Sequence, residues 1–491
     1  MNVSSLRWTA LLAALLLLSS PAFAQDTDDE PETVEEVEAI EDDEADDEAS
    51  EAEENVEEDV DEVIDEIEEE AEPTPPVAPP VTAPPAPEPP ATPDTDEADE
   101  SDEDFAEDDP MRGAMIAPAR EAQERGVRIR GNLDDGDRWT LDLGGFIGAR
   151  YSLSQNDPSV ELFGRNDGFR INDARLILRG NMDNGLGAVF SLDAGSRLIR
   201  TAPDSPVDEL AARMADTYIS YRPFQHLEIL AGQFKAPFDI EELISTTDLL
   251  FISRSVANRG VQNVEGYNVP GLSQGRQIGL QVRGSYFPLA DENQVDGPGI
   301  SFASAVTNGN GANVSLNNND RYALYQRLSL HWGEMVSLGG AVFHNDTTLG
   351  DPPNQVNQVH QGWTADLLVS AYGATLIGSA ISRSSTTAEL EDSELTEMGY
   401  QVQIGYQEPF FGFQAAYRFA TLDPTFEHAQ TDDPALAEFF ENDSRIHHTL
   451  GLNYNATGYP IRLMTNYTIT MDEEAVAIDN NRLDVLLQLQ W

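Results

Sequence analysis

Basic side chains are the part of this sequence whose type and spacing indicate chemistry. Three of them lie in the long polar stretch 235–275, and others recur at alternate positions of short apolar–polar repeats. Ammonium and guanidinium groups that line a pore favour anions. The sequence therefore predicts an anion path with its constriction in this stretch, lined by Lys235, Arg254, Arg259, Arg175, Arg179, Arg327 and Arg418.

The alternation around these residues predicts the elements that carry them. Residues 139–153 place apolar and polar side chains on opposite parities, and residues 398–406, 411–420, 445–454 and 461–469 repeat the pattern. Period two identifies β-strands, and a strand of about ten tilted residues crosses an outer membrane. An arginine facing lipid at mid-depth costs about 2–4 kcal/mol, so the arginines belong in the lumen. We expect an all-β fold, a transmembrane antiparallel β-barrel.

The connections between these strands alternate in length. Short turns are predicted near residues 181–185, 223–226, 333–334, 373, 408–409 and 456–459, with a longer one at 285–299. Long polar loops lie between them, and this asymmetry is typical of outer-membrane barrels. Counting segments gives about 16 strands, an even number that places both ends of the barrel in the periplasm. The basic stretch 235–275 is the third long loop.

The residues before the barrel differ in composition. Arg7, an apolar run over 10–18 and the sequence Ala22-Phe23-Ala24 predict a secretory signal peptide, residues 1–24. Residues 25–109 hold 41 acidic and no basic residues, with eleven prolines between 73 and 93, which predicts a disordered acidic, Pro-rich segment in the periplasm. A transition segment, 110–137, leads to the barrel domain, 138–491.

Acidic residues on the predicted lumen face leave a second interpretation of the arginines. Such acids could pair with the arginines and leave a mixed-charge wall with mild selectivity; they are Asp142, Asp173, Asp193, Asp216, Glu228, Asp366 and Asp484. The lumen-facing arginines also include Arg150, Arg283, Arg445 and Arg462. Both interpretations stay open.

Other functions find little support in the sequence. His447 and His448 are adjacent and would point to opposite faces of a strand, and cysteine is absent. No Gly-rich phosphate loop, Gly-x-Ser-x-Gly elbow or His-Glu-x-x-His pattern occurs. We therefore predict no catalytic or metal site, no cofactor and no nucleic-acid partner, and a protein that is not an enzyme.

Several segments resemble the phosphate-selective porin O and P family. They are residues 232–238 (Gly-Gln-Phe-Lys-Ala-Pro-Phe), 174–176 (Ala-Arg-Leu), 307–311 (Thr-Asn-Gly-Asn-Gly) and 327–328 (Arg-Leu). The resemblance spans roughly 139–491 and implies a homotrimeric porin with an inward-folded third loop. The closing strand, 483–491, resembles the signal that the outer-membrane assembly machinery recognises, with Trp491 in place of the more usual Phe. Lys235 is the single lysine, so the family's lysine cluster is not carried over.

These observations predict a Gram-negative outer-membrane porin that lets small hydrophilic solutes diffuse passively, with an anion or phosphate preference. Its barrel surface would contact outer-membrane lipid. The alternative is a structural barrel that anchors the acidic segment as a periplasmic tether.

Overall fold

A computed structural model of the chain describes residues 127–132, 138–155, 167–202, 205–210, 212–262, 265, 269–287, 297–350, 355–387, 394–428, 443–456, 459–473 and 477–491. The predicted signal peptide and the predicted disordered segment lie outside the described residues.

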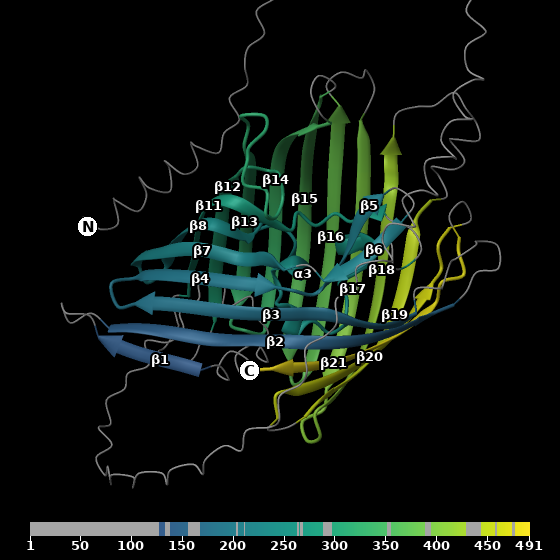
Figure 1. Cartoon of the computed structure of the whole chain (residues 1–491), viewed down its shortest axis with the longest axis horizontal. Coiled ribbons are helices and arrows are strands. Elements are labelled where there is room, and N and C mark those ends of the chain that lie inside the picture. The colour runs from purple at the N-terminus through teal and green to yellow at the C-terminus, as the bar shows by residue number, and fades with distance from the viewer. Residues whose placement is uncertain are drawn as a thin grey trace, which may run out of the picture. The chain divides into compact units, whose positions relative to one another are not determined.

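Sixteen antiparallel strands form one closed ring in the described part of the chain (Figure 1). The ring closes because β2 (Arg138–Ser154) pairs with both β3 (Gly168–Met182) and β21 (Arg482–Gln490). The strands between them, in ring order, are β4 (Leu186–Asp193), β7 (Arg213–Phe224), β8 (Leu227–Lys235), β11 (Arg276–Tyr286), β12 (Pro298–Thr307), β13 (Ala323–Trp332), β14 (Val336–Leu349), β15 (Val356–Ala371), β16 (Ala374–Thr387), β17 (Leu395–Gln407), β18 (Phe413–His428), β19 (Arg445–Asn455) and β20 (Ile461–Thr470). The predicted fold class and strand number are confirmed.

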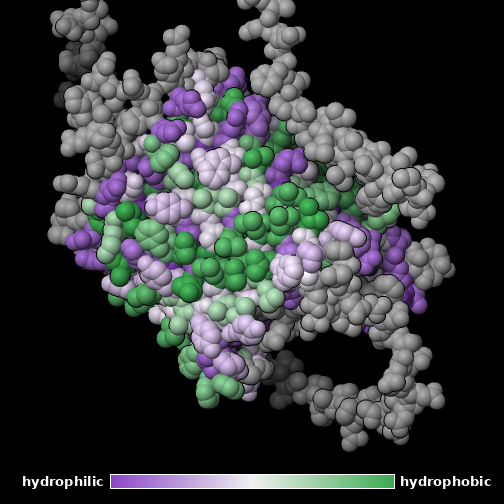
Figure 2. Space-filling view, turned by 180° about the vertical axis from the view of Figure 1, so that it is seen from behind, coloured by the Kyte–Doolittle hydropathy of each residue, from purple (hydrophilic) through white to green (hydrophobic). Residues whose placement is uncertain are grey.

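Strict alternation assigns the two faces of the wall. Along β13, Tyr325, Arg327 and His331 are buried toward the lumen, whereas Leu324 and Leu328 are about half exposed on the outside. Lipid offers the backbone no hydrogen-bond partner, so a spanning sheet must close and present apolar side chains outward. Figure 2 shows hydrophobic side chains gathered across the middle of one outer face.

Connections at one end of the barrel are short, as predicted. Hydrogen-bonded turns join β3 to β4, β7 to β8, β13 to β14 and β15 to β16. At the other end, the predicted loops are shorter than expected because β14, β16 and β18 continue to Leu349, Thr387 and His428. The ends of these strands carry mainly polar side chains, so the apolar alternation did not identify them. They stay paired because an antiparallel hairpin keeps its backbone hydrogen bonds in water after it leaves the bilayer. The second long loop also contains a hairpin, β5 (Ser196–Ala202) with β6 (Ser205–Leu210).

An additional strand, β1 (Val127–Asn132), lies inside the segment predicted as a linker. It pairs with residues 138–143 of β2, directly beside the stretch of β2 that pairs with β21. Trp491 connects the two stretches, because its N–H donates to Gly145 O (3.0 Å) and its carbonyl accepts from Gly145 N (2.8 Å). A Cβ at Gly145 would meet the backbone carbonyl of Arg175 on β3 first and would lie 2.9 Å from the Trp491 ring. Glycine therefore allows both β3 and Trp491 to approach β2. Six residues were too few for the alternation pattern to identify β1.

The third long loop, Ala236–Gly275 between β8 and β11, holds the other short elements. They are α3 (Ile240–Leu243), η2 (Thr246–Asp248), α4 (Val256–Arg259) and the pair β9 (Gly260–Val261) and β10 (Val269–Pro270). We call this segment loop 3. None of the helices in the described residues has the length and apolar character needed to cross a membrane.

The orientation of the barrel can be tested with single cysteines. Ser315→Cys, in the long connection after β12, should react with an impermeant maleimide on intact cells, whereas Asp183→Cys, in the turn after β3, should not. Both should react after the cells are permeabilised, which shows that each thiol is accessible. Labelling of the second variant alone on intact cells would mean that the barrel has the opposite orientation.

Candidate pore constriction

Loop 3 leaves the wall at β8 and contacts the opposite side of the ring. β18 is eight strands from β8 in either direction around the sixteen, and α4 contacts β17, β18 and β19. In Figure 1, α3 lies between the near and the far strands of the barrel. A segment that spans this diameter narrows the lumen, so loop 3 forms the constriction.

Local sequence determines how loop 3 folds. The Asp239 side chain caps α3 by accepting from the N–H of Glu242 (3.3 Å), and Ser255 caps α4 through the N–H of Asn258 (3.3 Å). Such side-chain caps satisfy backbone donors at a helix start. Gly260 then ends α4 with a φ of 72°, a left-handed value that favours glycine.

Arginines of the wall bind the carbonyl groups of loop 3. Arg327 on β13 donates to Phe238 O (2.7 Å), and Arg418 on β18 donates to Ser253 O (2.8 Å). Arg462 on β20 donates to Thr247 O (2.7 Å) and to Leu249 O (2.9 Å). A buried backbone carbonyl without a partner is costly, so these contacts hold the loop across the lumen.

Two neutral side chains and one acid complete the attachment. Asn453 on β19 donates to Leu250 O (2.9 Å), and Asn466 on β20 accepts from Ile252 N (2.7 Å). The buried carboxylate of Glu241 accepts from Ser255 N (3.0 Å) and from Gln403 of β17 (2.9 Å), and lies 3.4 Å from Arg418. Loop 3 is thus joined to four consecutive strands, β17 to β20.

Apolar contacts accompany these hydrogen bonds. Phe238 packs edge-on against Phe343 of β14, with ring centroids 4.9 Å apart. Phe251 packs in a second buried cluster with Leu368 and Ile377 of the wall. The guanidinium of Arg418 lies 4.5 Å from the centroid of the Phe251 ring, a cation–π arrangement. Loop 3 therefore has a hydrophobic core that it shares with the lumen side of the wall.

Lys235 and Arg254 lie together at the end of α3. Lys235 Nζ donates to Ile244 O (3.0 Å), and Arg254 donates to Glu241 O (3.0 Å) and to Ile244 O (3.2 Å). The last carbonyls of a helix lack partners within the helix, so cations are favourable there. Both side chains are only partly buried.

Charged neighbours surround this pair. Arg254 forms an ion pair with Glu242 (3.2 Å), and Arg276 of β11 binds Asp216 of β7 through two contacts of 3.0 Å. Burial opposes ionisation of Glu242, but Arg254 and Lys235 hold the pKa of its carboxyl below the usual value. Three cations and two carboxylates therefore make up this cluster.

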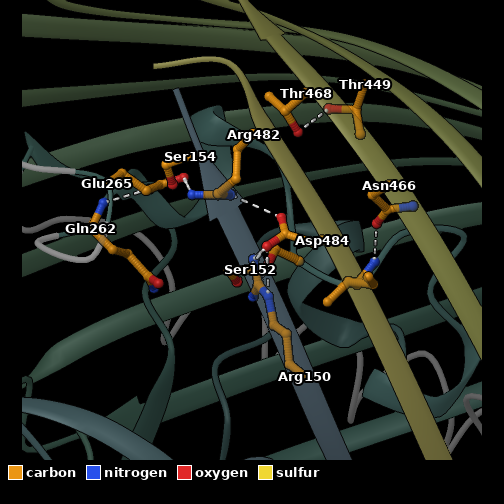
Figure 3. Close-up of polar contacts among 12 residues, drawn as sticks. Arg150, Ser152, Ser154, Gln262, Glu265, Thr449, Asn466, Thr468, Arg482 and Asp484 are labelled. Atoms are coloured by element: carbon orange, nitrogen blue, oxygen red, sulfur yellow. Dashed lines mark hydrogen bonds and ion pairs between the residues drawn. The ribbon is translucent and has the colours of Figure 1, made fainter. Parts of the chain in front are cut away.

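A second group of charges joins loop 3 to the wall strands β21 and β2. Arg259, at the end of α4, binds Glu265 (2.6 and 2.8 Å). Glu265 also pairs with Arg482 of β21 (Figure 3). Arg482 in turn contacts Asp484 (2.8 Å), which pairs with Arg150 of β2 (2.7 Å). Burial opposes ionisation of Glu265, yet Arg259 and Arg482 hold the pKa of its carboxyl well below the usual range.

The predicted residues divide into two sets. Lys235, Arg254 and Arg259 lie at or in loop 3, and Arg327 and Arg418 contact it from the wall. Arg175 and Arg179 lie on β3 instead: Arg175 binds Asp193 (2.7 Å) and stacks 5.2 Å from the Phe146 centroid, and Arg179 is half-buried opposite Asp142. Arg327 and Arg418 are about 95% buried, each with 5% exposure. A part in an ion path stays a prediction for all seven.

The predicted pairing of arginines with lumen acids occurs repeatedly. Arg150 pairs with Asp484, Arg175 with Asp193, Arg283 with Glu228 (2.7 Å) and Arg327 with Asp366 (2.8 Å). His447 is buried toward the lumen, while the adjacent His448 bonds Tyr417 (2.8 Å) on the outside, so the pair cannot share one ion. Across the residues that the structure describes, no group of three or more potential metal ligands was found.

Sequence reasoning missed Arg482, Arg276 and the loop contacts of Gln403, Asn453 and Asn466. Each amide residue was visible as a polar residue on the lumen parity of its strand. Its partner was not, because an irregular loop of forty residues has no periodicity from which its path could be inferred. The alternation pattern therefore identified the strand face on which each residue lies, but not its partner in loop 3.

The fold and the inward loop define a porin-type barrel, and the family comparison agrees. Residues 147–324 match the phosphate-selective porin O and P family. The match includes loop 3 with Lys235, Arg254 and Arg259, so the predicted family resemblance is confirmed there. The protein is an outer-membrane porin that forms a channel.

Solved structures of similar fold are distant in sequence. The anion-selective porin from Comamonas acidovorans is 13% identical, with 72% of this chain and 100% of that chain covered and a TM-score of 0.47. Salmonella typhi OmpF in complex with daunomycin is 13% identical, with 74% of this chain and 100% of that chain covered and a TM-score of 0.46. The DcaP channel of Acinetobacter baumannii is 14% identical, with 74% of this chain and 99% of that chain covered and a TM-score of 0.45. No curated protein matches the sequence.

Removal of one wall arginine should release loop 3. Arg462→Met deletes two charge-assisted hydrogen bonds to loop carbonyls, each worth about 1.5–3 kcal/mol. We expect a larger and noisier single-channel conductance, measured in planar bilayers. Arg179→Met is the matched control, since no described hydrogen bond joins Arg179 to loop 3. Equal conductance changes in both variants would contradict the attachment of loop 3 through Arg462.

Proposed function

We propose that this porin passes small hydrophilic solutes by passive diffusion with a weak preference for anions. The observation that carries the proposal is the charge balance beside the constriction. Arg254 pairs with Glu242 and Arg276 pairs with Asp216, whereas every described hydrogen bond of the Lys235 ammonium goes to a backbone carbonyl. The positive charge of Lys235 therefore has no carboxylate of its own among the described contacts. A fixed charge at a narrow site acts on a permeating ion more strongly than charges beyond a Debye length, about 8–10 Å.

Paired charges explain why the preference should be weak and the passage passive. Along the rest of the wall, arginines lie against carboxylates, as in Arg327–Asp366 and Arg383–Glu397 (2.5 Å). A paired guanidinium offers a passing anion little net attraction, so no site holds it for long. Weak binding at several places permits fast conduction.

The remaining parts of the chain fit the same proposal. We propose that residues 1–24 are removed after export and that the acidic segment lies in the periplasm. We also propose that the outer-membrane assembly machinery recognises the C-terminal strand, which ends in Trp491, and that the barrel works as a homotrimer. The family resemblance supports the trimer. The position of β1 beside the short turns, which face the periplasm in such barrels, supports the location of the segment before it.

Charge removal at the constriction tests the selectivity. Lys235→Gln with Arg254→Gln removes two positive charges but keeps amide donors for the loop carbonyls. The anion-to-cation permeability ratio, obtained from the reversal potential in a salt gradient, should fall by about fivefold, which corresponds to ~1 kcal/mol for unit charges 4 Å apart in water.

Arg321→Gln is the control, because it removes a charge from an arginine that is 66% exposed and pairs with Asp346 (2.8 Å) away from loop 3. It should leave the ratio unchanged. A wild-type channel that prefers cations would refute the anion preference, and equal shifts in both variants would place the selective charges elsewhere.

Truncation tests the role of the N-terminal segment. Deleting residues 26–104 keeps β1 and every described ladder, so the barrel should stay heat-modifiable on gels and conduct in bilayers. Deleting residues 26–137 also removes β1 and the Arg128–Asp142 ion pair (2.7 Å). A barrel that fails to assemble after the shorter deletion would show that the acidic segment belongs to the fold.

A further inference from the structure

A small polar cavity lies between loop 3 and the wall strands β18 to β21. Three guanidiniums line it, those of Arg259, Arg418 and Arg482, together with one carboxylate, that of Asp484, and the polar side chains of His447, Thr449 and Thr468. The cavity has room for about one water-sized particle. Figure 3 shows Thr449 and Thr468 in hydrogen-bond contact near Arg482 (3.4 Å between their hydroxyl oxygens). A space this rich in donors is suited to an acceptor.

The charges around the cavity do not balance. A continuous chain of contacts runs from Arg150 through Asp484, Arg482 and Glu265 to Arg259. It contains three cations and two anions, a net charge of +1. These five side chains have between 3 and 11% exposure, so water screens the excess charge poorly. A buried charge without a counter-charge costs several kcal/mol.

The other charged groups around the cavity leave this excess in place. Arg170 is a further cation near Arg150, but it donates to Ser152 Oγ (2.7 Å) and is not among the residues that line the cavity. Arg418 and Glu241 form their own neutral pair at 3.4 Å. The carboxylate of Asp472 lies 3.9 Å from His447 Nε2, but it accepts a hydrogen bond from Ile446 N (3.0 Å) and is not among the residues that line the cavity.

Two buried nitrogens of the lining have no hydrogen-bond partner in the described part of the chain. They are Nε of Arg418 and Nε2 of His447, on side chains that are about 94% buried. The Arg418 nitrogen always carries a proton, and an imidazole can carry one at Nε2. Buried donors are nearly always satisfied, so an acceptor is expected beside them.

We propose that this cavity binds a monovalent, water-sized anion, and that chloride is the physiological ligand class. One negative charge neutralises the excess, and its spherical surface accepts from guanidinium, imidazole and hydroxyl donors at once. A divalent oxyanion such as phosphate exceeds both the charge and the space. The anion contacts both the end of α4 in loop 3 and the wall strands β18, β19, β20 and β21. It therefore holds loop 3 against the wall.

Bromide substitution tests the site directly. Crystals of the full-length protein grown with sodium bromide in place of chloride should show an anomalous peak between Arg259, Arg418 and Arg482. Ordered side chains around a cavity without a bromide peak would overturn the proposal and indicate a bound water.

Anion exchange tests whether the site acts on stability. At constant ionic strength, chloride should raise the unfolding temperature of the barrel relative to gluconate, which is too large for the cavity, because a ligand that binds the folded state stabilises it. Thr449→Val with Thr468→Val should lose this chloride effect. Thr364→Val, a buried lumen-facing threonine on β15, is the matched control and should keep it.

A chloride effect of equal size in all three proteins would overturn the proposal, because it would come from the surface. Since neither readout measures conduction, a failure here is distinguishable from a failure of the proposed channel function.

Discussion

Loop 3 can enter the barrel only if the wall replaces the hydrogen bonds that its backbone gives up with water. The wall supplies them with arginine: Arg327, Arg418 and Arg462 each donate to loop carbonyls on the lumen side. Arginine suits this role because its planar group carries several donors and stays charged. The narrow part of the channel, its charge cluster and the cavity behind the loop all depend on this substitution of guanidinium for water.

The same constraint explains how the lumen tolerates so many charges. A carboxylate as well as a carbonyl stabilises a guanidinium in a partly dry interior, and Arg327 has both in Asp366 and Phe238. Charge is therefore organised in small groups whose net values are near zero. Under the proposed function, selectivity in such a wall comes from local imbalances of one charge, which total composition cannot reveal.

The sequence predicted the wall better than the site. Period-two alternation identified the strands and the lumen face of Arg150, Arg175 and Arg327, because each strand repeats one simple rule. The turns were also found, since glycine and polar residues interrupt the pattern there. Loop 3 obeys no such rule: the partners of Asn453 and Arg462 lie more than two hundred residues away in sequence. Only the three-dimensional path of the loop joins them.

The closure of the ring has a consequence for how the protein reaches its native state. The contact between Arg150 and Asp484 joins residues 334 positions apart, and Gly145 bonds the last residue of the chain. Contacts of such long sequence separation form slowly, because the entropy of closing the chain opposes them until both ends are present. β21 therefore remains an unpaired edge until it pairs with β2, and unpaired edges favour aggregation. A chain without β21 would keep nearly all of its other contacts, but β2 and β20 would each keep an unpaired edge and the barrel would stay open.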